Sequence, residues 1–506
     1  MKIDRLLVSA AHKSSGKTTI SLGLCAAFSA QGVRVQPFKK GPDYIDPMWL
    51  ARAAGRDCFN LDAYLMDDAA LVRCFRGALG DAQLAIVEGN KGLYDGLALD
   101  GSNSNAALAM RLALPVLLVL DARGMTRGIA PLILGYQAFE PGIRIGGVIL
   151  NRLGGERHEA KLRAVIEHYT DVPVLGAVAE DERLAVTERH LGLMPCAEVD
   201  DVQERVAEIA RIVGAQVDLE RVRALAASAN DWPADGRAAS VAGRAAVVAP
   251  LRAQAAMPTP PNPQHGAPLR VAIARDRAFG FYYPDDLAAL EAAGAQLLPF
   301  DTLHDDALPA AIDGLFIGGG FPEACLDALE ANTKLRGAIR DALAVGLPAY
   351  AECGGLMYLA RSITWRGRTA QMVGAIPGDA LMHARPQGRG YVHLRETTAM
   401  PWPAAAGAAG AAGAAGAACS ATLRCHEFHH SSLANLDPDV AFAYRVERGQ
   451  GIDGENDGIV RGNLLASYAH LRSAAGTHWA PRFIAFARAW RDLEHARSRT
   501  VGMQAA

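Results

Sequence analysis

The first 215 residues alternate short apolar runs with segments of helical periodicity. The runs are apolar at consecutive positions, which is typical of strands that helices cover on both faces of a parallel sheet. The candidate strands are residues 5–11, 34–39, 84–89, 116–122, 145–151 and 172–178. This pattern predicts a doubly wound α/β fold for the first half of the chain.

A second α/β block follows a change in composition. Its apolar runs are residues 269–276, 314–320, 347–355 and 464–471. Residues 229–268, between the blocks, are rich in Ala and Pro and show little periodicity, as is typical of a linker. Residues 404–421 are an Ala/Gly tract, which we interpret as an insertion in a surface loop. The predicted domains are 1–228 and 269–490, followed by a C-terminal tail at 491–506.

The net charge, the cysteines and the longest apolar run exclude several classes of protein. The net charge is −3 over 506 residues, so no overall field favours nucleic acid. The eight cysteines are scattered without a CxxC pair, which indicates reduced thiols. The chain begins directly with a strand pattern rather than a signal peptide, and its most apolar run, 112–122, is too short to cross a bilayer. We therefore expect a cytoplasmic protein that binds neither membranes nor nucleic acid.

The segment AAHKSSGKTTISLG, residues 10–23, has the strand–loop–helix context of a phosphate-binding loop. Gly16 would let the backbone approach phosphates, Lys17 would contact the outer phosphates, and Thr18 could ligate Mg²⁺. The segment departs from the usual GxxxxGK[ST] pattern, because Ala11 stands at the first glycine. We predict a nucleotide site here; the alternative is a helix cap that contains a glycine.

Acidic residues follow successive predicted strands of the same half. Glu88 ends an apolar strand, the position of a Walker-B-like acid, whereas Asp43, Asp46 and Asp95 lie in glycine-punctuated loops. Each of them alone could simply cap a turn or a helix. Together they converge on the carboxyl edge of the predicted sheet, where such folds bind ligands. Hard carboxylate oxygens at this edge predict a magnesium site.

Cys353 occupies a pattern of its own in the second half. A predicted strand, 348–352, gives way at Cys353 to a sharp turn and a helix, as in a nucleophile elbow. Gly354 follows it directly, and GLFIGGGFPE at 314–323 ends another strand in three glycines, so both segments could supply oxyanion-binding amides. The alternative is a buried cysteine that acts as a small hydrophobic residue.

A thiolate nucleophile needs a base, and histidines occur in three segments: 425–432, 466–472 and 476–479. His470 follows a β-type run and precedes the last predicted helix. His426 and His429 are better interpreted as structural or substrate-side residues. The residues alone leave the choice of base open.

These motifs together resemble the cobyrinic (or hydrogenobyrinic) acid a,c-diamide synthases of cobalamin biosynthesis. The resemblance covers nearly the whole chain. In the first half it lies in SSGKTT, KKGPDYIDPMW, EGNKGLYDG and ERHLGLMP, and in the second in GLFIGGGFPE, AYAECGGLMYL, CHEFHHS and ASYAHL. It implies an ATP-dependent amide ligase domain, similar to dethiobiotin synthetase, followed by a class I glutamine amidotransferase domain.

The resemblance also implies roles for individual residues. Cys353 matches the glutaminase nucleophile and His470 its base. The remaining implied positions are Gly16, Lys17, Thr18 and Thr19 for ATP, Thr18, Asp43 and Glu88 for Mg²⁺, Tyr44, Asp46 and Asp95 for the ligase substrate, and Gly319, Gly320 and Gly354 for the oxyanion.

The chain departs from the family pattern at three places. Arg472 stands where the family has a second histidine, and Asn90 and Lys91 stand where small or apolar residues are usual. No acid clearly occupies the third position of the glutaminase triad, for which Glu427 is a weak candidate.

The reaction that the resemblance implies is the ATP- and glutamine-dependent amidation of two carboxylates of a corrinoid polycarboxylate. Alternatives are a diamide synthase for a nickel tetrapyrrole, a cobyric acid synthase, and a non-enzymatic partitioning-type ATPase switch. The last is disfavoured because His12 stands where such switches carry a lysine. The sequence leaves open whether the corrinoid holds cobalt, which carboxylate reacts first, and whether the protein is a homodimer.

Overall fold

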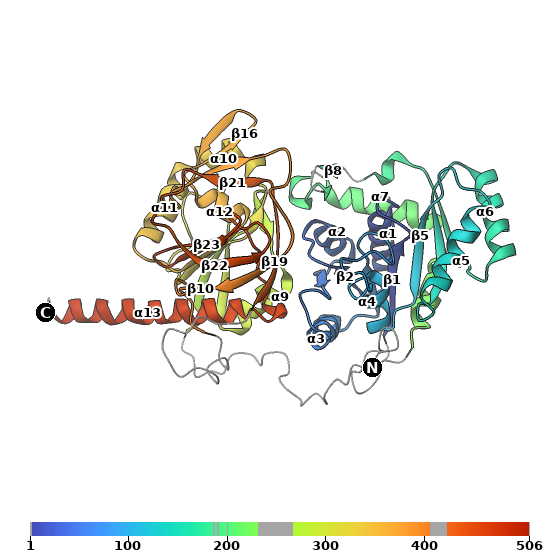
Figure 1. Cartoon of the computed structure of the whole chain (residues 1–506), viewed down its shortest axis with the longest axis horizontal. Coiled ribbons are helices and arrows are strands. Elements are labelled where there is room, and N and C mark those ends of the chain that lie inside the picture. The colour runs from blue at the N-terminus through green and yellow to red at the C-terminus, as the bar shows by residue number, and fades with distance from the viewer. Residues whose placement is uncertain are drawn as a thin grey trace. The chain divides into compact units, whose positions relative to one another are not determined.

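The computed structural model describes residues 3–185, 188–189, 192–199, 201–230, 267–404 and 422–504. The chain divides into two compact units, residues 1–254 and 255–506, which are described separately (Figure 1). The predicted linker lies mostly outside the described residues, as does the predicted Ala/Gly insertion apart from residue 404.

The first unit contains a seven-stranded sheet with the order β3-β2-β4-β1-β5-β6-β7, in which every pairing is parallel. Its strands are β1 (Asp4–Ala10), β2 (Val35–Lys40), β3 (Phe59–Leu61), β4 (Leu84–Glu88), β5 (Val116–Asp121), β6 (Ile145–Leu153) and β7 (Val174–Ala179). The doubly wound fold predicted from the apolar runs is confirmed. β3 was not predicted, because three residues carry too little periodicity to be recognised.

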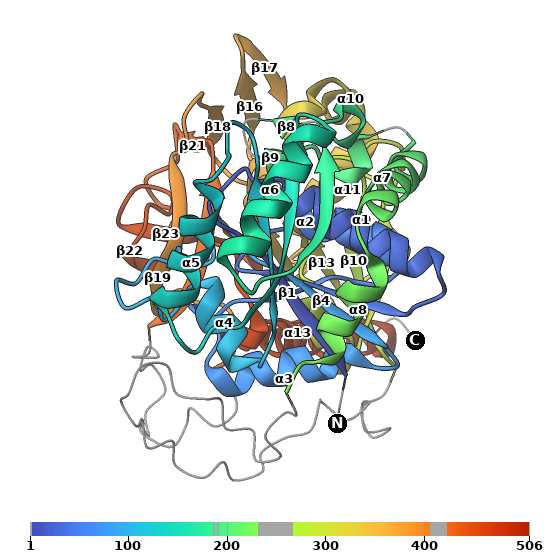
Figure 2. The same cartoon turned by 90° about the vertical axis from the view of Figure 1, so that its right-hand side faces the viewer.

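Helices cover both faces of this sheet. They are α1 (Lys17–Ala30), α2 (Ile45–Ala54), α3 (Asp68–Leu79), α4 (Asn105–Arg111), α5 (Ile129–Phe139), α6 (Glu156–Tyr169), α7 (Val202–Gln216) and α8 (Leu219–Ala227). α1 packs against α2 and α7 on one side, whereas α5 packs against α6 on the other (Figure 2). A two-stranded hairpin, β8 (Glu188–Arg189) and β9 (Gly192–Leu193), precedes α7.

The second unit is built on a nine-stranded mixed sheet with the order β12-β10-β13-β15-β24-β23-β22-β19-β20. The strands from β12 to β24 pair in parallel, and those from β24 to β20 pair antiparallel. They are β10 (Leu269–Ala274), β12 (Ala295–Phe300), β13 (Gly314–Ile317), β15 (Ala349–Glu352), β19 (Gly388–Glu396), β20 (Leu423–His429), β22 (Ala441–Arg448), β23 (Asn456–Arg461) and β24 (Leu464–Ser467).

In the described part of this unit, smaller sheets and the α-helices α9 to α13 accompany the large sheet. The small strands are β11 (Phe279–Phe281), β14 (Gly319–Gly320), β16 (Ser362–Trp365), β17 (Arg368–Gln371), β18 (Asp379–Met382) and β21 (Ser431–Ala434). The helices are α9 (Pro284–Ala292), α10 (Leu326–Ala331), α11 (Thr333–Ala344), α12 (Gly354–Leu359) and α13 (Trp479–Gln504). One apolar core includes Leu356 and Tyr358 of α12, and a second includes Trp479 and Phe483 of α13.

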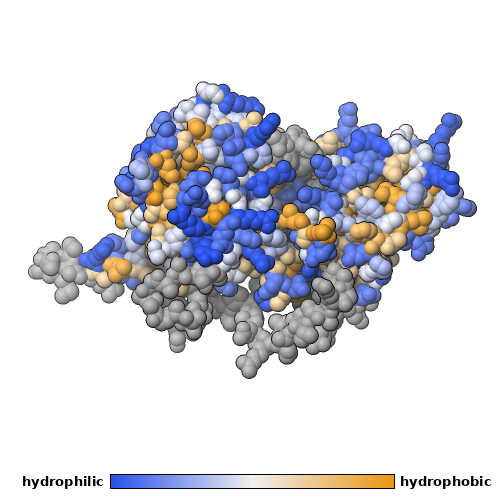
Figure 3. All heavy atoms as spheres, viewed as in Figure 1, coloured by the Kyte–Doolittle hydropathy of each residue, from blue (hydrophilic) through white to orange (hydrophobic). Residues whose placement is uncertain are grey.

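Helix α13 continues through residue 490, the predicted end of the domain, into the residues predicted as a tail (Figure 1). On the face shown in Figure 3, hydrophobic side chains form small patches within a mostly hydrophilic surface. No helix among the described residues combines the length and apolar composition that a bilayer crossing requires.

Candidate active sites

The phosphate loop joins β1 to α1 and is held from β6. Gly16 caps α1 with φ 86°, a left-handed conformation that favours glycine. A Cβ at this position would lie 2.1 Å from the side-chain nitrogen of Asn151. That nitrogen donates a hydrogen bond of 2.9 Å to the carbonyl of Ser15, and Arg152 donates one of 2.8 Å to the carbonyl of Ser14. The loop is therefore fixed by β6, with the N-terminus of α1 behind it, as phosphate binding requires.

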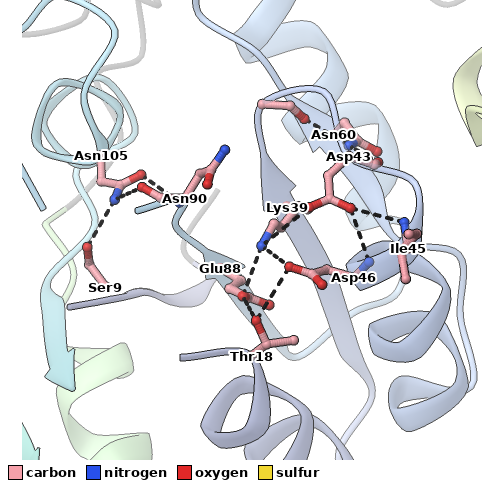
Figure 4. A network of polar contacts seen from close by, with 11 residues as sticks. Ser9, Thr18, Lys39, Asp43, Ile45, Asp46, Asn60, Glu88, Asn90 and Asn105 are labelled. Atoms are coloured by element: carbon pink, nitrogen blue, oxygen red, sulfur yellow. Dashed lines mark hydrogen bonds and ion pairs between the residues drawn. The ribbon is translucent and has the colours of Figure 1, made fainter. Parts of the chain in front are cut away.

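Three carboxylates surround the buried ammonium group of Lys39 (Figure 4). Its Nζ lies 2.5 Å from Asp46 Oδ2, 2.9 Å from Glu88 Oε1 and 3.9 Å from Asp43 Oδ2. Thr18 donates a hydrogen bond of 2.6 Å to Glu88 Oε1. The strand register explains this arrangement, because Lys39 lies directly beside Glu88 on the neighbouring strand. The structure thus brings together Thr18, Asp43, Asp46 and Glu88, and adds Lys39, which the sequence did not single out.

Burial and neighbouring charges shift the titration of these groups. Burial alone would lower the pKa of Lys39, but the surrounding carboxylates raise it well above its usual value. Burial and the nearby Lys39 lower the pKa of Lys17 to about 8, although Glu88 and Asp46 oppose the shift. Burial raises the pKa of Glu88. Lys39 is therefore already neutralised by carboxylates.

The donor atoms beside the phosphate loop fit a hard cation. In the ranges that the structure describes, no group of three or more His, Cys, Asp or Glu side chains is arranged to hold a metal. Glu88 Oε2 is nevertheless buried and has no hydrogen-bond partner among those residues. Thr18 donates its proton to Glu88, which leaves the lone pairs of its oxygen available. Asp43 instead accepts the backbone N–H groups of Ile45 and Asp46 at the start of α2. Glu88 and Thr18 are thus the oxygens best suited to Mg²⁺.

The loop after β4 is braced by Asn105 of α4. Its side-chain nitrogen donates to the carbonyls of Asn90 and Gly92, both at 2.8 Å, and its oxygen accepts the N–H of Asn90 at 3.0 Å. Asp95 lies further along this loop, outside the Lys39 cluster, and accepts the N–H of Gly92 at 2.9 Å. Two other predicted residues lie at helix starts: Tyr44 is the N-cap residue of α2, and Thr19 lies in the first turn of α1.

Cys353 lies at the turn from β15 to α12, as the sequence predicted for a nucleophile elbow. Its φ of 47° is uncommon for a residue with a side chain. Its N–H donates to the carbonyl of Ser467 on the neighbouring strand at 2.8 Å, and its Sγ lies 3.8 Å from the carbonyl oxygen of Phe428. The thiol is therefore presented at the carboxyl end of the central strands.

His470 is the histidine that this structure brings to Cys353, whereas His478 is exposed at the start of α13. On its other side, His470 Nδ1 lies 3.2 Å from Glu352 Oε2. Burial alone would lower the pKa of His470, but hydrogen bonds with Cys353 and Glu352 raise it to about 10. An imidazolium beside the thiol favours the thiolate, the nucleophilic form.

Glu352, and not Glu427, occupies the third position of this constellation. Its other oxygen accepts the hydroxyl of Tyr350 at 2.6 Å and the N–H of Leu471 at 2.9 Å, which fixes the carboxylate. The candidate Glu427 was wrong, because its carboxylate accepts the backbone N–H groups of Gln450 and Gly451. The sequence analysis missed Glu352. The signal that could have identified it is a charged residue at the end of a buried apolar strand.

Two histidines of β20 contact the segment that carries His470. The ring of His426 stacks on that of His470 with centroids 4.9 Å apart. Burial lowers the pKa of His426 well below its usual value, with His470 and Arg472 adding to the shift. The ring of His429 stacks on that of Tyr468 at 3.8 Å. Arg472 is buried and forms an ion pair of 3.0 Å with Asp285. This ion pair connects α9 to the segment after β24 that carries His470.

The glycines predicted for the oxyanion site lie close to Cys353 and His470. A Cβ on Gly319 would lie 2.8 Å from His470 Cε1, and one on Gly354 would lie 2.9 Å from the backbone nitrogen of Gly320. Only residues without side chains permit these approaches. The N–H of Gly318, by contrast, already donates to the hydroxyl of Tyr282 at 2.9 Å.

Comparisons with known proteins agree with the two-unit architecture. Residues 7–193 match the family described as the CobQ/CobB/MinD/ParA nucleotide binding domain, and residues 270–477 match the CobB/CobQ-like glutamine amidotransferase domain. A cobyrinate a,c-diamide synthase of Magnetococcus marinus is 43% identical over 97% of this chain and 98% of that relative. Proteins of the same name from Methanosarcina acetivorans and Listeria monocytogenes serotype 4b are 39% and 35% identical. These matches cover 94% and 93% of this chain, and 93% and 96% of the respective relatives.

Proposed function

The chain belongs to the cobyrinate a,c-diamide synthase family, and from this premise we propose how its residues perform the ATP- and glutamine-dependent amidation. The second unit releases ammonia from glutamine. The first unit uses ATP to activate the a and c carboxylates of the corrinoid. The observation that carries the proposal is the continuous contact from Cys353 through His470 to Glu352, in a chain that also holds a phosphate loop.

In the glutaminase reaction, the Cys353 thiolate attacks the side-chain amide carbon of glutamine. Amides of Gly319, Gly320 and Gly354 stabilise the oxyanion. His470 returns the proton to the leaving nitrogen, so that ammonia departs and a thioester remains. Water, deprotonated by His470, then hydrolyses the thioester to glutamate. Glu352 keeps the imidazole oriented through Nδ1 and stabilises its protonated form.

In the ligase reaction, a carboxylate oxygen of the corrinoid attacks the γ-phosphorus of ATP, and ADP leaves. Ammonia then displaces phosphate from the acyl phosphate and gives the amide. The nucleotide is held by Gly16, Lys17, Thr18 and Thr19. Lys17 also offsets the negative charge of the transferred phosphoryl group. Tyr44, Asp46 and Asp95 lie on the substrate side. Thr18 and Glu88, with Asp43 nearby, would hold Mg²⁺, which supplies further charge neutralisation when bound.

The setting of the reaction belongs to the same proposal. The cysteines of the described residues are thiols and not disulfides, which supports a reducing compartment and hence the cytoplasm. A homodimer stays a prediction. The competing partitioning-type switch would use the first unit alone and leave the amidotransferase match of residues 270–477 without a purpose.

The test is amidation by Cys353→Ala with either nitrogen donor. The purified variant receives ATP, Mg²⁺, cobyrinic or hydrogenobyrinic acid, and either glutamine or ammonium salt, and amides are counted by mass spectrometry. We expect amidation with ammonia at the rate of the unmodified protein and none above background with glutamine. Loss of both reactions in a folded variant would overturn the division of labour.

A further inference from the structure

Two adjacent lysines at the end of β2 have opposite surroundings. Lys39 lies among three carboxylates. Lys40, the next residue, extends to the other side of the strand, since successive side chains alternate. Lys40 is partly buried, and its ammonium group makes no hydrogen bond and no ion pair with any residue that the structure describes. A partly buried cation without a direct ion pair costs free energy unless a ligand supplies one.

A second cation lies on the loop that borders Lys40. Lys91 is exposed and has a left-handed φ of 54° on the loop after β4. The two loops approach each other, because a Cβ on Gly41 would lie 3.6 Å from the side-chain nitrogen of Asn90. Hydrogen bonds fix both loops. The side chain of Asn60 donates to the carbonyl of Gly41 at 2.9 Å, and the side chain of Asn105 donates to the carbonyl of Asn90 at 2.8 Å in the loop after β4.

Charge effects support this proximity. Burial lowers the pKa of Lys40 to about 8, and the positive charges of Lys91 and Lys39 contribute to the lowering, while Asp62 and Asp95 oppose it. Both aspartates already accept backbone N–H groups, Asp62 from Tyr64 and Leu65 and Asp95 from Gly92. Neither Lys40 nor Lys91 forms an ion pair with a residue that the structure describes. The pair of ammonium groups therefore remains available to an external anion.

We propose that Lys40 and Lys91 bind a carboxylate of the corrinoid other than the one that is phosphorylated. This inference rests on the proposed function, which supplies a substrate with several carboxylates. A carboxylate fits better than a nucleotide phosphate, because Lys40 lies across the strand from Lys39 and Thr18 of the phosphate site. By anchoring one side chain of the macrocycle beside Asp95, the two lysines help to select which carboxylate reaches the γ-phosphate.

The test measures corrinoid binding and amidation in Lys40→Met, Lys91→Met and the double variant. Lys161→Met, at an exposed position on α6, is the matched control. With saturating ATP and glutamine, we expect KM for cobyrinic acid to rise about tenfold in each single variant and more in the double variant, as for the loss of a charge-assisted contact. The dissociation constant measured without ATP, from corrinoid absorbance, should rise in parallel. kcat, KM for ATP and the glutaminase rate should stay within about twofold.

Three results separate the possible failures. Unchanged corrinoid KM and dissociation constant in the double variant would overturn the inference while the proposed function stands. A rise in KM for ATP alone would assign the lysines to the nucleotide instead. If the unmodified protein neither binds nor amidates the corrinoid, the proposed function fails together with this inference. Lys40→Arg keeps the positive charge, so it should bind the corrinoid more tightly than Lys40→Met does. Equally weak binding in a folded Lys40→Arg variant would also count against the inference.

Discussion

The two active sites of this chain are built by different physical means. In the first unit, long charged side chains converge: the ammonium group of Lys39 is compensated by Asp46 and Glu88, with Thr18 beside them. In the second unit, close backbone approaches set the geometry: Gly319 contacts the ring of His470, and Cys353 adopts a positive φ. His470 lies beside the thiol of Cys353 and forms an ion pair of 3.2 Å with Glu352.

This difference reflects what each site must accommodate. A phosphoryl group brings several negative charges, so the first site needs movable cations and anions that can exchange partners when nucleotide and metal bind. A tetrahedral intermediate brings a single oxyanion at a fixed position, so the second site needs rigid amides and an aligned thiol. We therefore expect the first site to be most sensitive to changes of charge and the second to changes of shape and hydrogen bonding.

The largest effect should follow Glu352→Gln. The amide cannot stabilise the imidazolium and favours the wrong tautomer of His470, so the glutaminase kcat should fall about 10³- to 10⁴-fold, by analogy with the triad aspartate of serine proteases. Amidation with ammonia should be unchanged. If the glutaminase rate falls less than about tenfold, Glu352 is a structural residue and not part of the triad.

The same substitution has a pH signature. The raised pKa of His470 means that its protonated form stabilises the folded protein fully below about 6.5, and that this stabilisation is lost as pH rises through about 10. Removing the carboxylate of Glu352 removes one cause of the shift, so the titration of His470 should move to lower pH. Nitrogen-15 NMR of labelled histidines measures this directly. An unmoved titration would contradict the assigned contact.

Lys39→Met should mainly affect stability. It leaves the buried carboxylate of Glu88 and the partly buried carboxylate of Asp46 without their cation, and breaking a buried ion pair typically costs about 3–5 kcal/mol in the free energy of unfolding. Urea denaturation of the first unit's transition measures the loss, and the exposed Lys161→Met serves as control. A loss below about 1 kcal/mol would show that the cluster rearranges readily without its lysine.

Lys17→Ala should slow amidation with either nitrogen donor by about 10²- to 10³-fold, because one cation at the transferred phosphoryl group is lost. Glutamine hydrolysis should persist, since Lys17 belongs to the other unit. Parallel assays of glutamate release and ADP release distinguish the glutaminase reaction from the ligase reaction. Unaltered ATP-dependent amidation would refute the phosphate role.

Gly319→Ala is the smallest change and tests shape alone. The added methyl group would lie 2.8 Å from His470 Cε1 and must displace the ring, so glutaminase activity should fall about 10²-fold, as for a displacement of about 1 Å at a reacting group. Gly337→Ala on α11, where a Cβ meets nothing within 4 Å, is the control. Equal activity in both variants would show that the ring has room to move.

The parallel sheet, the loop before α1 and the turn at Cys353 could be predicted because each depends on local sequence. Apolar runs identify buried strands, and GKT and ECGG combine turn chemistry with reactive groups. Glu352 could not be assigned in this way, because its contact with His470 depends on β15 lying beside β24 in a register that sets Glu352 opposite Ser467. The role of Lys39 likewise depends on the register of β2 against β4. No single local motif determines which strands distant in the sequence pair with one another, or in which register.

The strands β19 and β20 contribute to the glutaminase site at one end only. The Ala/Gly tract falls between Glu396 and Leu423, at the connecting end of these strands. The contacts with the thiol and its base come from the other end, where the carbonyl of Phe428 faces Cys353 and that of His426 accepts the N–H of His470. We therefore expect that a change in the length of this connection leaves the contacts of the glutaminase site in place.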